Sequence, residues 1–143
     1  GLSADHLWLE VTESVMITET AQTLQALRRL NSMGVRVAVD DFGTGYSSLS
    51  MLQRFPVQCV KIDRTFVQEL GEERETQNLV RTIIAMAGSM NADIVAEGIE
   101  TTQQLAQLAA MRCHRAQGYL ISPPIAAEHV PAAVRRIQDT AWT

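Results

Sequence analysis

Residues 37–49 read VAVDDFGTGYSSL, and this stretch decides how the rest of the chain is interpreted. A short apolar run ends in two adjacent acids, Asp40 and Asp41. A loop with two glycines and a pair of serines follows, which predicts a turn and a new helix. In parallel α/β proteins the carboxyl ends of strands are where ligands bind, so the acid pair is a candidate site. The structural alternative is that one of the two acids only caps the next helix.

Composition indicates one globular domain of the α/β class. The chain has 143 residues, of which 46% are hydrophobic and 5% are aromatic. This is enough for a single domain with a real core, but a complete eight-fold α/β barrel needs about 250 residues. The net charge is -4 and the basic residues are scattered. We therefore expect no binding to long nucleic acid.

The cysteines and the hydropathy pattern indicate a reduced, cytoplasmic setting. Cys59 and Cys113 are the only cysteines, and with the three histidines they form no zinc-binding pattern. No apolar run approaches the roughly 18 residues that a membrane span needs. We expect packed thiols and no membrane contact by this segment, although other parts of a longer protein could carry an anchor.

Strand-like and helix-like patterns alternate along the chain, which predicts a parallel sheet with right-handed crossovers. The expected strands are residues 7–11, 35–39, 57–62, 92–96 and 118–121. The expected helices begin at Thr18 or Thr20, at Ser47, after residues 71–75, at Thr101 with Gln104 as a capping box, and at Ala127. For the helix after residues 71–75, the apolar pattern predicts a buried face of Leu79, Ile83, Met86, Ala87 and Met90.

Charged or amide side chains lie at or near the end of every expected strand, namely Glu10, Asp40 with Asp41, Lys61, Glu97 and Gln117. Ionised carboxylates that are held together repel one another unless cations neutralise them, and oxygen ligands favour Mg²⁺ or Mn²⁺. Two ions about 3.5–4 Å apart would stabilise both the attacking and the leaving oxygen of a displacement at phosphorus. In such a site Asp40 is the natural bridge and Asp41 binds the second ion.

Spacing alone leaves three other uses of these residues open. In an enolase-like site, metal ions hold a carboxylate substrate while Lys61 removes a proton. A receiver domain places an acid pair and a lysine around a phosphorylated aspartate, although no further strand supplies a lone aspartate between the pair and Lys61. A structural network of ion pairs would need neither ion nor substrate.

Five motifs resemble, in this order, the later motifs of the EAL-domain family of cyclic-di-GMP phosphodiesterases. They are LEVTES at 9–14, DDFGTGYSSL at 40–49, VKIDRTFV at 60–67, VAEGIET at 95–101 and QGYLISPPI at 117–125. The resemblance covers essentially the whole chain. It implies a TIM-barrel-like fold and the hydrolysis of cyclic di-GMP to the linear dinucleotide pGpG, with Mg²⁺ or Mn²⁺ as the cofactor.

The resemblance also implies a ligand set for two metal ions. By position in the motifs, Glu10 is similar to a ligand of the first metal and Asp40 to the bridging ligand. Asp41 is similar to a ligand of the second metal. Glu97 is similar to a ligand or a base close to that second metal.

Four further residues receive roles from the same resemblance. Lys61 is similar to the cation that holds the attacking water, and Gln117 to a residue that contacts metal-bound water or substrate. Glu13 resembles the glutamate that steadies the loop after the acid pair. Glu100 resembles a residue that supports the site from behind, but it also fits an ordinary acid in front of a helix.

The chain departs from the family at its front. The Glu-Ala-Leu strand, a phosphate-binding arginine and an asparagine ligand would all precede Gly1. We therefore expect residues 1–143 to be the C-terminal part of a single EAL domain, with a partial TIM-barrel-like parallel sheet, flanking helices and no N-terminal strands.

Two consequences follow from this departure. Without two ligands of the first metal, the isolated segment is expected to be weakly active or inactive. Its exposed sheet edges are expected to associate, for example in a homodimer. The rival function is a degenerate module that binds cyclic di-GMP or a partner protein without catalysis.

Overall fold

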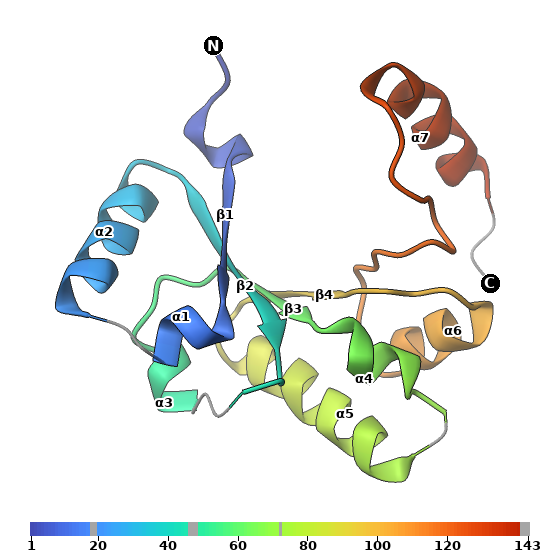
Figure 1. Cartoon of the computed structure of the whole chain (residues 1–143), viewed down its shortest axis with the longest axis horizontal. Helices are drawn as coiled ribbons and strands as arrows, with labels where there is room; N and C mark the ends of the chain where they lie inside the picture. Colours follow the sequence, from blue (N-terminus) through green and yellow to red (C-terminus); the bar gives the residue numbers. More distant parts are fainter. Residues whose placement is uncertain (18–19, 46–48, 72, 141–143) are drawn as a thin grey trace.

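Four parallel strands form one sheet in the order β1-β2-β3-β4, so strands that are neighbours in sequence are also neighbours in space (Figure 1). A computed structural model describes residues 1–17, 20–45, 49–71 and 73–140. The strands are β1 (Trp8–Thr12), β2 (Arg36–Phe42), β3 (Cys59–Ile62) and β4 (Asp93–Ala96). An α/β arrangement with a parallel sheet is thus confirmed.

The helices fill the connections between the strands and continue beyond them. They are α1 (Glu13–Ile17), α2 (Ala21–Ser32), α3 (Leu49–Leu52), α4 (Arg64–Gln68), α5 (Arg74–Ser89), α6 (Thr102–Ala110) and α7 (Val130–Asp139), with short 3-10 helices at Ala4–His6 and Ala127–His129. Figure 1 shows α7 lying away from the sheet at the end of an extended segment. No residue of α7 is buried.

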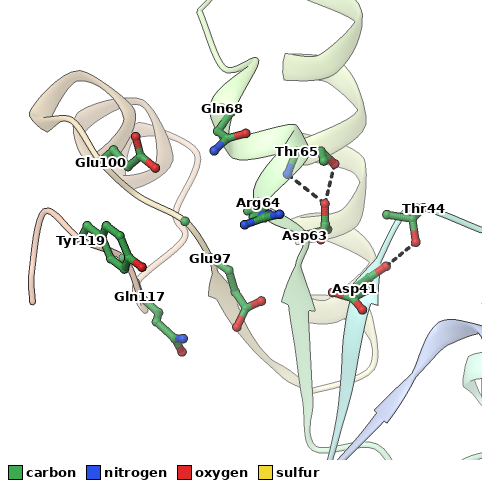
Figure 2. A pocket seen from close by; sticks show the side chains of 12 residues that line it. Asp41, Thr44, Asp63, Arg64, Thr65, Gln68, Glu97, Glu100, Gln117 and Tyr119 are labelled. Atoms are coloured by element: carbon green, nitrogen blue, oxygen red, sulfur yellow. Dashed lines mark hydrogen bonds between the residues drawn. The ribbon is translucent and has the colours of Figure 1, made fainter. Parts of the chain in front are cut away.

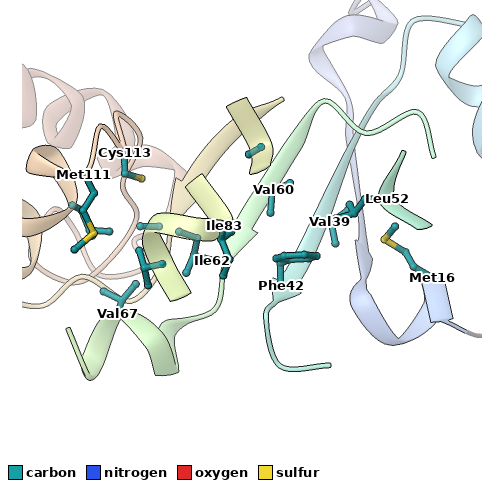
Figure 3. Close-up of a cluster of buried hydrophobic side chains, with 14 of the residues drawn as sticks. Met16, Val39, Phe42, Leu52, Val60, Ile62, Val67, Ile83, Met111 and Cys113 are labelled. Atoms are coloured by element: carbon teal, nitrogen blue, oxygen red, sulfur yellow. The ribbon is translucent and has the colours of Figure 1, made fainter. Parts of the chain in front are cut away.

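One face of the sheet is apolar and the other carries the charged side chains, because successive side chains of a strand point to opposite sides. Val37, Val39, Val60 and Ile62 are fully buried on the side that packs against helices. Figure 3 shows Val39, Val60 and Ile62 in the core with side chains from the helices. The register aligns Glu10 with Ala38 and Ala38 with Cys59, which lies two residues before Lys61, so Glu10 and Lys61 share the opposite face.

Two predicted helix starts are confirmed by their capping contacts. The Thr20 side chain accepts a hydrogen bond from the N–H of Thr23 at the start of α2. Thr101 and Gln104 form the expected capping box at the start of α6. The other expected starts at Thr18 and Ser47 lie outside the described residues.

The predicted fifth strand is wrong. Within residues 116–121, only Ala116 bridges to β4, through Ala96, and the next residues form a turn in which Ile121 N–H donates to Gly118 O. A Cβ on Gly118 would lie 2.2 Å from Ile99 O, so the glycine backbone packs directly on the neighbouring segment. This close approach, together with the prolines that follow, ends the pairing after one bridge.

The predicted buried face of α5 is displaced by part of a turn. Thr76, Val80, Ile83 and Ala87 are buried, whereas Leu79 is 39% exposed. Thr76 can be buried because its hydroxyl donates to Glu69 Oε2. The sequence pattern treated Thr76 as polar and therefore rotated the predicted face.

Candidate active and metal-binding site

Lys61 lies among three carboxylates that come from three other parts of the sheet. Its Nζ is 2.8 Å from Glu10 Oε1 of β1, 2.9 Å from Asp40 Oδ1 of β2, and 2.8 Å from Glu97 Oε1, which directly follows β4. Four consecutive strands thus contribute to one cluster at their carboxyl ends. The predicted meeting of these side chains at a common edge is what the structure shows.

The ammonium group of Lys61 stays charged although it is buried. Burial alone would lower the pKa of this lysine, but hydrogen bonds to Glu10, Glu97 and Asp40 outweigh that cost and raise the pKa well above its usual range. Lys61 is therefore a fixed positive charge at neutral pH rather than a group that accepts a proton. This does not favour the enolase-like alternative, in which Lys61 would have to be a base.

Asp41 lies at the end of β2, where the strand is irregular. The register shifts between Val39 and Phe42, and Asp41 has φ 53°, a left-handed conformation that only a few residue types adopt readily. Burial, then the charge of Asp40 and then that of Asp63 raise the pKa of Asp41. Two acids, Asp40 and Asp41, are thus adjacent in sequence yet face different neighbours.

The donor set at this edge fits a divalent cation. Asp40, Asp41 and Glu97 each offer a carboxylate oxygen, and these oxygens lie within 4.8 Å of one another. Asp40 Oδ1 is buried, and among the described residues it meets no donor other than the Lys61 ammonium. One lysine cannot neutralise four acids, so additional positive charge would lower the free energy of this edge.

Glu13 holds the loop that follows the acid pair. It is 2% exposed, and its Oε2 accepts hydrogen bonds from Gly43 N–H at 2.9 Å and Gly45 N–H at 3.1 Å. A Cβ on Gly45 would lie 2.9 Å from Glu13 Oε1, and one on Gly43 would lie 2.7 Å from the Phe66 ring. The glycines therefore let the loop pack tightly against both side chains.

A cavity of about 690 Å³ opens beside the cluster. Figure 2 shows Asp41 on one side of it and Glu97 and Gln117 on the other, with Glu100 further along the wall. Gln117 is fixed through its backbone, because its N–H donates to Ala96 O and its carbonyl accepts from Ile99 N–H. The cavity has the volume of a small-molecule site, for which roughly 300–1,000 Å³ is typical.

Sequence reasoning gave no role to several residues that line the same cavity, among them Asp63, Arg64 and Tyr119. Asp63 lies next to Asp41. Burial alone would raise the pKa of Asp63, but hydrogen bonds from the hydroxyl and N–H of Thr65 outweigh this effect and lower it. The sequence could have identified Asp63 as a site residue, because it lies two residues after Lys61 at the end of a strand and so continues the same face. Arg64 and Tyr119 carry no such signal.

The EAL domain family matches residues 1–124, and the chain belongs to this family. It is 44% identical over 143 residues to the uncharacterized protein Rv1354c of Mycobacterium tuberculosis, covering 98% of this chain and 23% of the relative. It is 45% identical over 125 residues to cyclic di-GMP phosphodiesterase NbdA of Pseudomonas aeruginosa, covering 87% of this chain and 16% of that protein. The chain therefore spans less than a quarter of the length of these curated relatives.

Solved structures confirm the partial TIM-barrel-like fold. The chain is similar to the PaMucR phosphodiesterase in complex with c-di-GMP, with a TM-score of 0.86 and 43% identity over 90% of this chain and 52% of that one. It is also similar to Klebsiella pneumoniae BlrP1 in a manganese and cyclic-di-GMP complex, with a TM-score of 0.81 and 34% identity over 86% of this chain and 31% of that one.

Proposed function

We propose that this chain is the catalytic C-terminal part of a single EAL domain that hydrolyses cyclic di-GMP to pGpG with Mg²⁺ or Mn²⁺. The observation that carries the proposal is the cluster in which Lys61 Nζ lies within 2.9 Å of Glu10, Asp40 and Glu97. The membership of the family and the ligands named for the similar solved structures support the same activity.

The carboxylates would hold the metal ions. We assign Glu10 to a first ion, Asp40 to a bridging position, and Asp41 and Glu97 to a second ion. The ions would supply positive charge that activates water and stabilises the oxygens at phosphorus. The proximity of Asp40, Asp41 and Glu97 supports this assignment.

The chain's own residues would orient the water and the phosphodiester. Lys61 would hold the attacking water and offset the charge that develops on the phosphate oxygens, because its ammonium is buried and permanently charged. Glu97 would accept the proton from that water, and Gln117 would contact substrate across the cavity. Glu13 would keep the loop after Asp41 in the position that the site needs.

The same proposal covers the partners. Cyclic di-GMP is the expected ligand, and a second copy of the chain is the expected protein partner. Among the described residues β1 pairs only with β2, so its other edge is open to another strand. Sedimentation velocity over a range of concentrations would detect the dimer.

Within the described residues no helix is both long and apolar enough to cross a bilayer.

The activity is tested by chromatography of the products that form from cyclic di-GMP with Mn²⁺. We expect little pGpG from the 143-residue chain and substantially more from a version extended toward the N-terminus, because the extension would supply missing metal ligands. Replacement of Asp40 by Asn in the extended protein should abolish the product. Equal rates for the two lengths would contradict the proposed dependence on an extension.

The rival proposal is a module that binds cyclic di-GMP or a partner protein without chemistry. The presence of Asp40, Asp41, Glu97 and Lys61 favours the enzyme, because a receptor needs no metal ligands. Calorimetry with cyclic di-GMP in the presence and absence of Mn²⁺ separates the two. Tight binding without metal and without turnover in the extended protein would favour the receptor.

A further inference from the structure

A second cavity lies at the amino end of β4, at the opposite end of the sheet from the acid cluster. It has a volume of about 430 Å³, is partly open to solvent, and is lined by the C-terminal part of α5, the start of β4 and the segment 112–115 that follows α6. This volume is within the range of roughly 300–1,000 Å³ that small-molecule sites occupy. The proposed phosphodiesterase mechanism makes no use of it.

The wall formed by residues 112–115 is basic. Arg112, His114 and Arg115 all line the cavity, and Asp93 is the only acid among its described lining residues. Asp93 Oδ2 lies 2.9 Å from an Arg115 guanidinium nitrogen, so this acid is already paired. Neither Arg112 nor His114 has an acidic partner within 4.0 Å among the described residues.

The backbone of this segment is fixed at Arg112 and at Arg115, although the side chains of Arg112, His114 and Arg115 are exposed. Arg112 has φ 65° directly after the last turn of α6, a position that glycine usually occupies. Arg115 is held at both ends, because its carbonyl accepts from Ala96 N–H at 3.0 Å and its side chain pairs with Asp93. A guanidinium has five N–H donors, so Arg115 keeps donors for a ligand beyond those used by Asp93.

The opposite wall is lined by small or apolar residues. Ile84, Ala85 and Gly88 of α5 line it together with Ala92 and Ile94. A ligand that matches both walls therefore carries a compact anionic group at one end and an apolar or planar body at the other.

We propose that this cavity binds a small phosphate monoester, with its phosphate between Arg112, His114 and Arg115 and its organic body against Ile84 and Ala92. Arginine pairs with phosphate through parallel hydrogen bonds, which explains the use of two guanidinium groups. The acidic cluster at the other end of the sheet would repel the same anion unless metal ions were bound there.

The test uses the full chain in a buffer with a chelator, so that metal-mediated binding at the acid cluster is removed. AMP is titrated while the amide signals are followed by NMR, with adenosine and inorganic phosphate as comparison ligands. We expect AMP to shift the amides of Ile94 and residues 112–115 saturably and to bind tighter than phosphate. Adenosine should not shift them. Shifts centred on Asp41 and Glu97, or phosphate binding as tight as that of AMP, would overturn the proposal.

Arg112→Gly is the most informative variant, because glycine adopts the positive φ at this position without strain. The fold should therefore persist, whereas the affinity for AMP should fall at least about tenfold, the loss expected when a charged hydrogen-bond donor is removed. His114→Gln should weaken binding in the same direction. The matched control is Arg81→Ala, on an exposed part of α5 outside the cavity, which should leave the affinity unchanged. AMP binding that is unaffected by Arg112→Gly would contradict the assignment.

Discussion

Lys61 is the residue on which the acid cluster depends, because three carboxylates share its single positive charge. Its side chain is 10% exposed, whereas that of Glu10 is 50% exposed, so water screens only part of the cluster. Removing the ammonium would leave the acids facing one another without compensation. The cost would appear in folding stability as well as in activity.

We predict that Lys61→Met lowers the free energy of unfolding in metal-free, low-salt buffer by on the order of 3 kcal/mol, as expected when one partner of a buried ion pair is removed. The loss should shrink when Mn²⁺ is added, because a bound cation would replace the missing positive charge. Urea unfolding would measure this loss of stability, with Arg81→Met as the exposed control. Unchanged stability at neutral pH would show that the cluster carries little repulsion.

The two cysteines illustrate how burial controls chemistry at single residues. Both are buried, and burial raises the pKa of Cys59 to about 11 and also raises that of Cys113. Since the folded pKa exceeds the unfolded one, the protonated thiol favours the folded state. This contribution to folding stability is fully present below about pH 9 and is lost as the pH rises through about 11.

Alkylation of the native thiols should accordingly be slow. At neutral pH a thiol with a pKa of about 11 has about a hundredth of the thiolate fraction of one with a pKa of 9.0, and packing slows access to Cys59 further. We expect both thiols to react with a disulfide reagent only after unfolding, whereas a cysteine introduced at exposed Ser32 reacts at once. Fast reaction of the native chain would contradict the burial of Cys59.

At the scale of elements, the junction between β2 and its loop connects the core to the site. Phe42 is buried in the core, and Gly43 and Gly45 donate their N–H groups to Glu13 at the start of α1. The position of Asp41 therefore depends on a carboxylate that lies in a different element. Removing that carboxylate would leave two N–H groups without their acceptor.

Glu13→Ala should reduce the free energy of unfolding by about 2 kcal/mol, since unsatisfied buried donors cost about 1–3 kcal/mol. It should also weaken Mn²⁺ binding, because Asp41 loses its support. Glu13→Gln keeps one carbonyl acceptor and should cost less on both measurements. Thermal unfolding and manganese titration of the two variants test this; equal losses would indicate that the negative charge, and not the acceptor, matters.

At the scale of the whole molecule, charges of opposite sign gather at the two ends of one sheet. The acids and Lys61 lie at the carboxyl ends of the strands, while Arg112, His114 and Arg115 line a cavity at the amino end of β4. The net charge of -4 hides this division because it sums over both ends.

The parts of this arrangement that follow from local patterns could be predicted from the sequence. Alternating strands and helices defined the sheet, and an acid or amine after each strand defined the edge at which Lys61, Asp40 and Glu97 meet. The turn at Gly118 could not be predicted, because it depends on contact with the distant Ile99 backbone. Burial of Thr76 likewise depends on a partner, Glu69, which lies directly after α4. The basic cavity joins residues from three separate elements, none of which has a motif.

The most direct test of the central claim is a manganese titration of the chain followed by paramagnetic broadening of its amide signals. Mn²⁺ should broaden the signals of Asp40, Asp41, Glu97 and Gly98 first, and should leave those of residues 112–115 sharp. The double replacement Asp40→Asn with Asp41→Asn should remove this selectivity, whereas Asp93→Asn should not. Broadening spread evenly over the surface, or unchanged in the double variant, would contradict a metal site at this edge of the sheet.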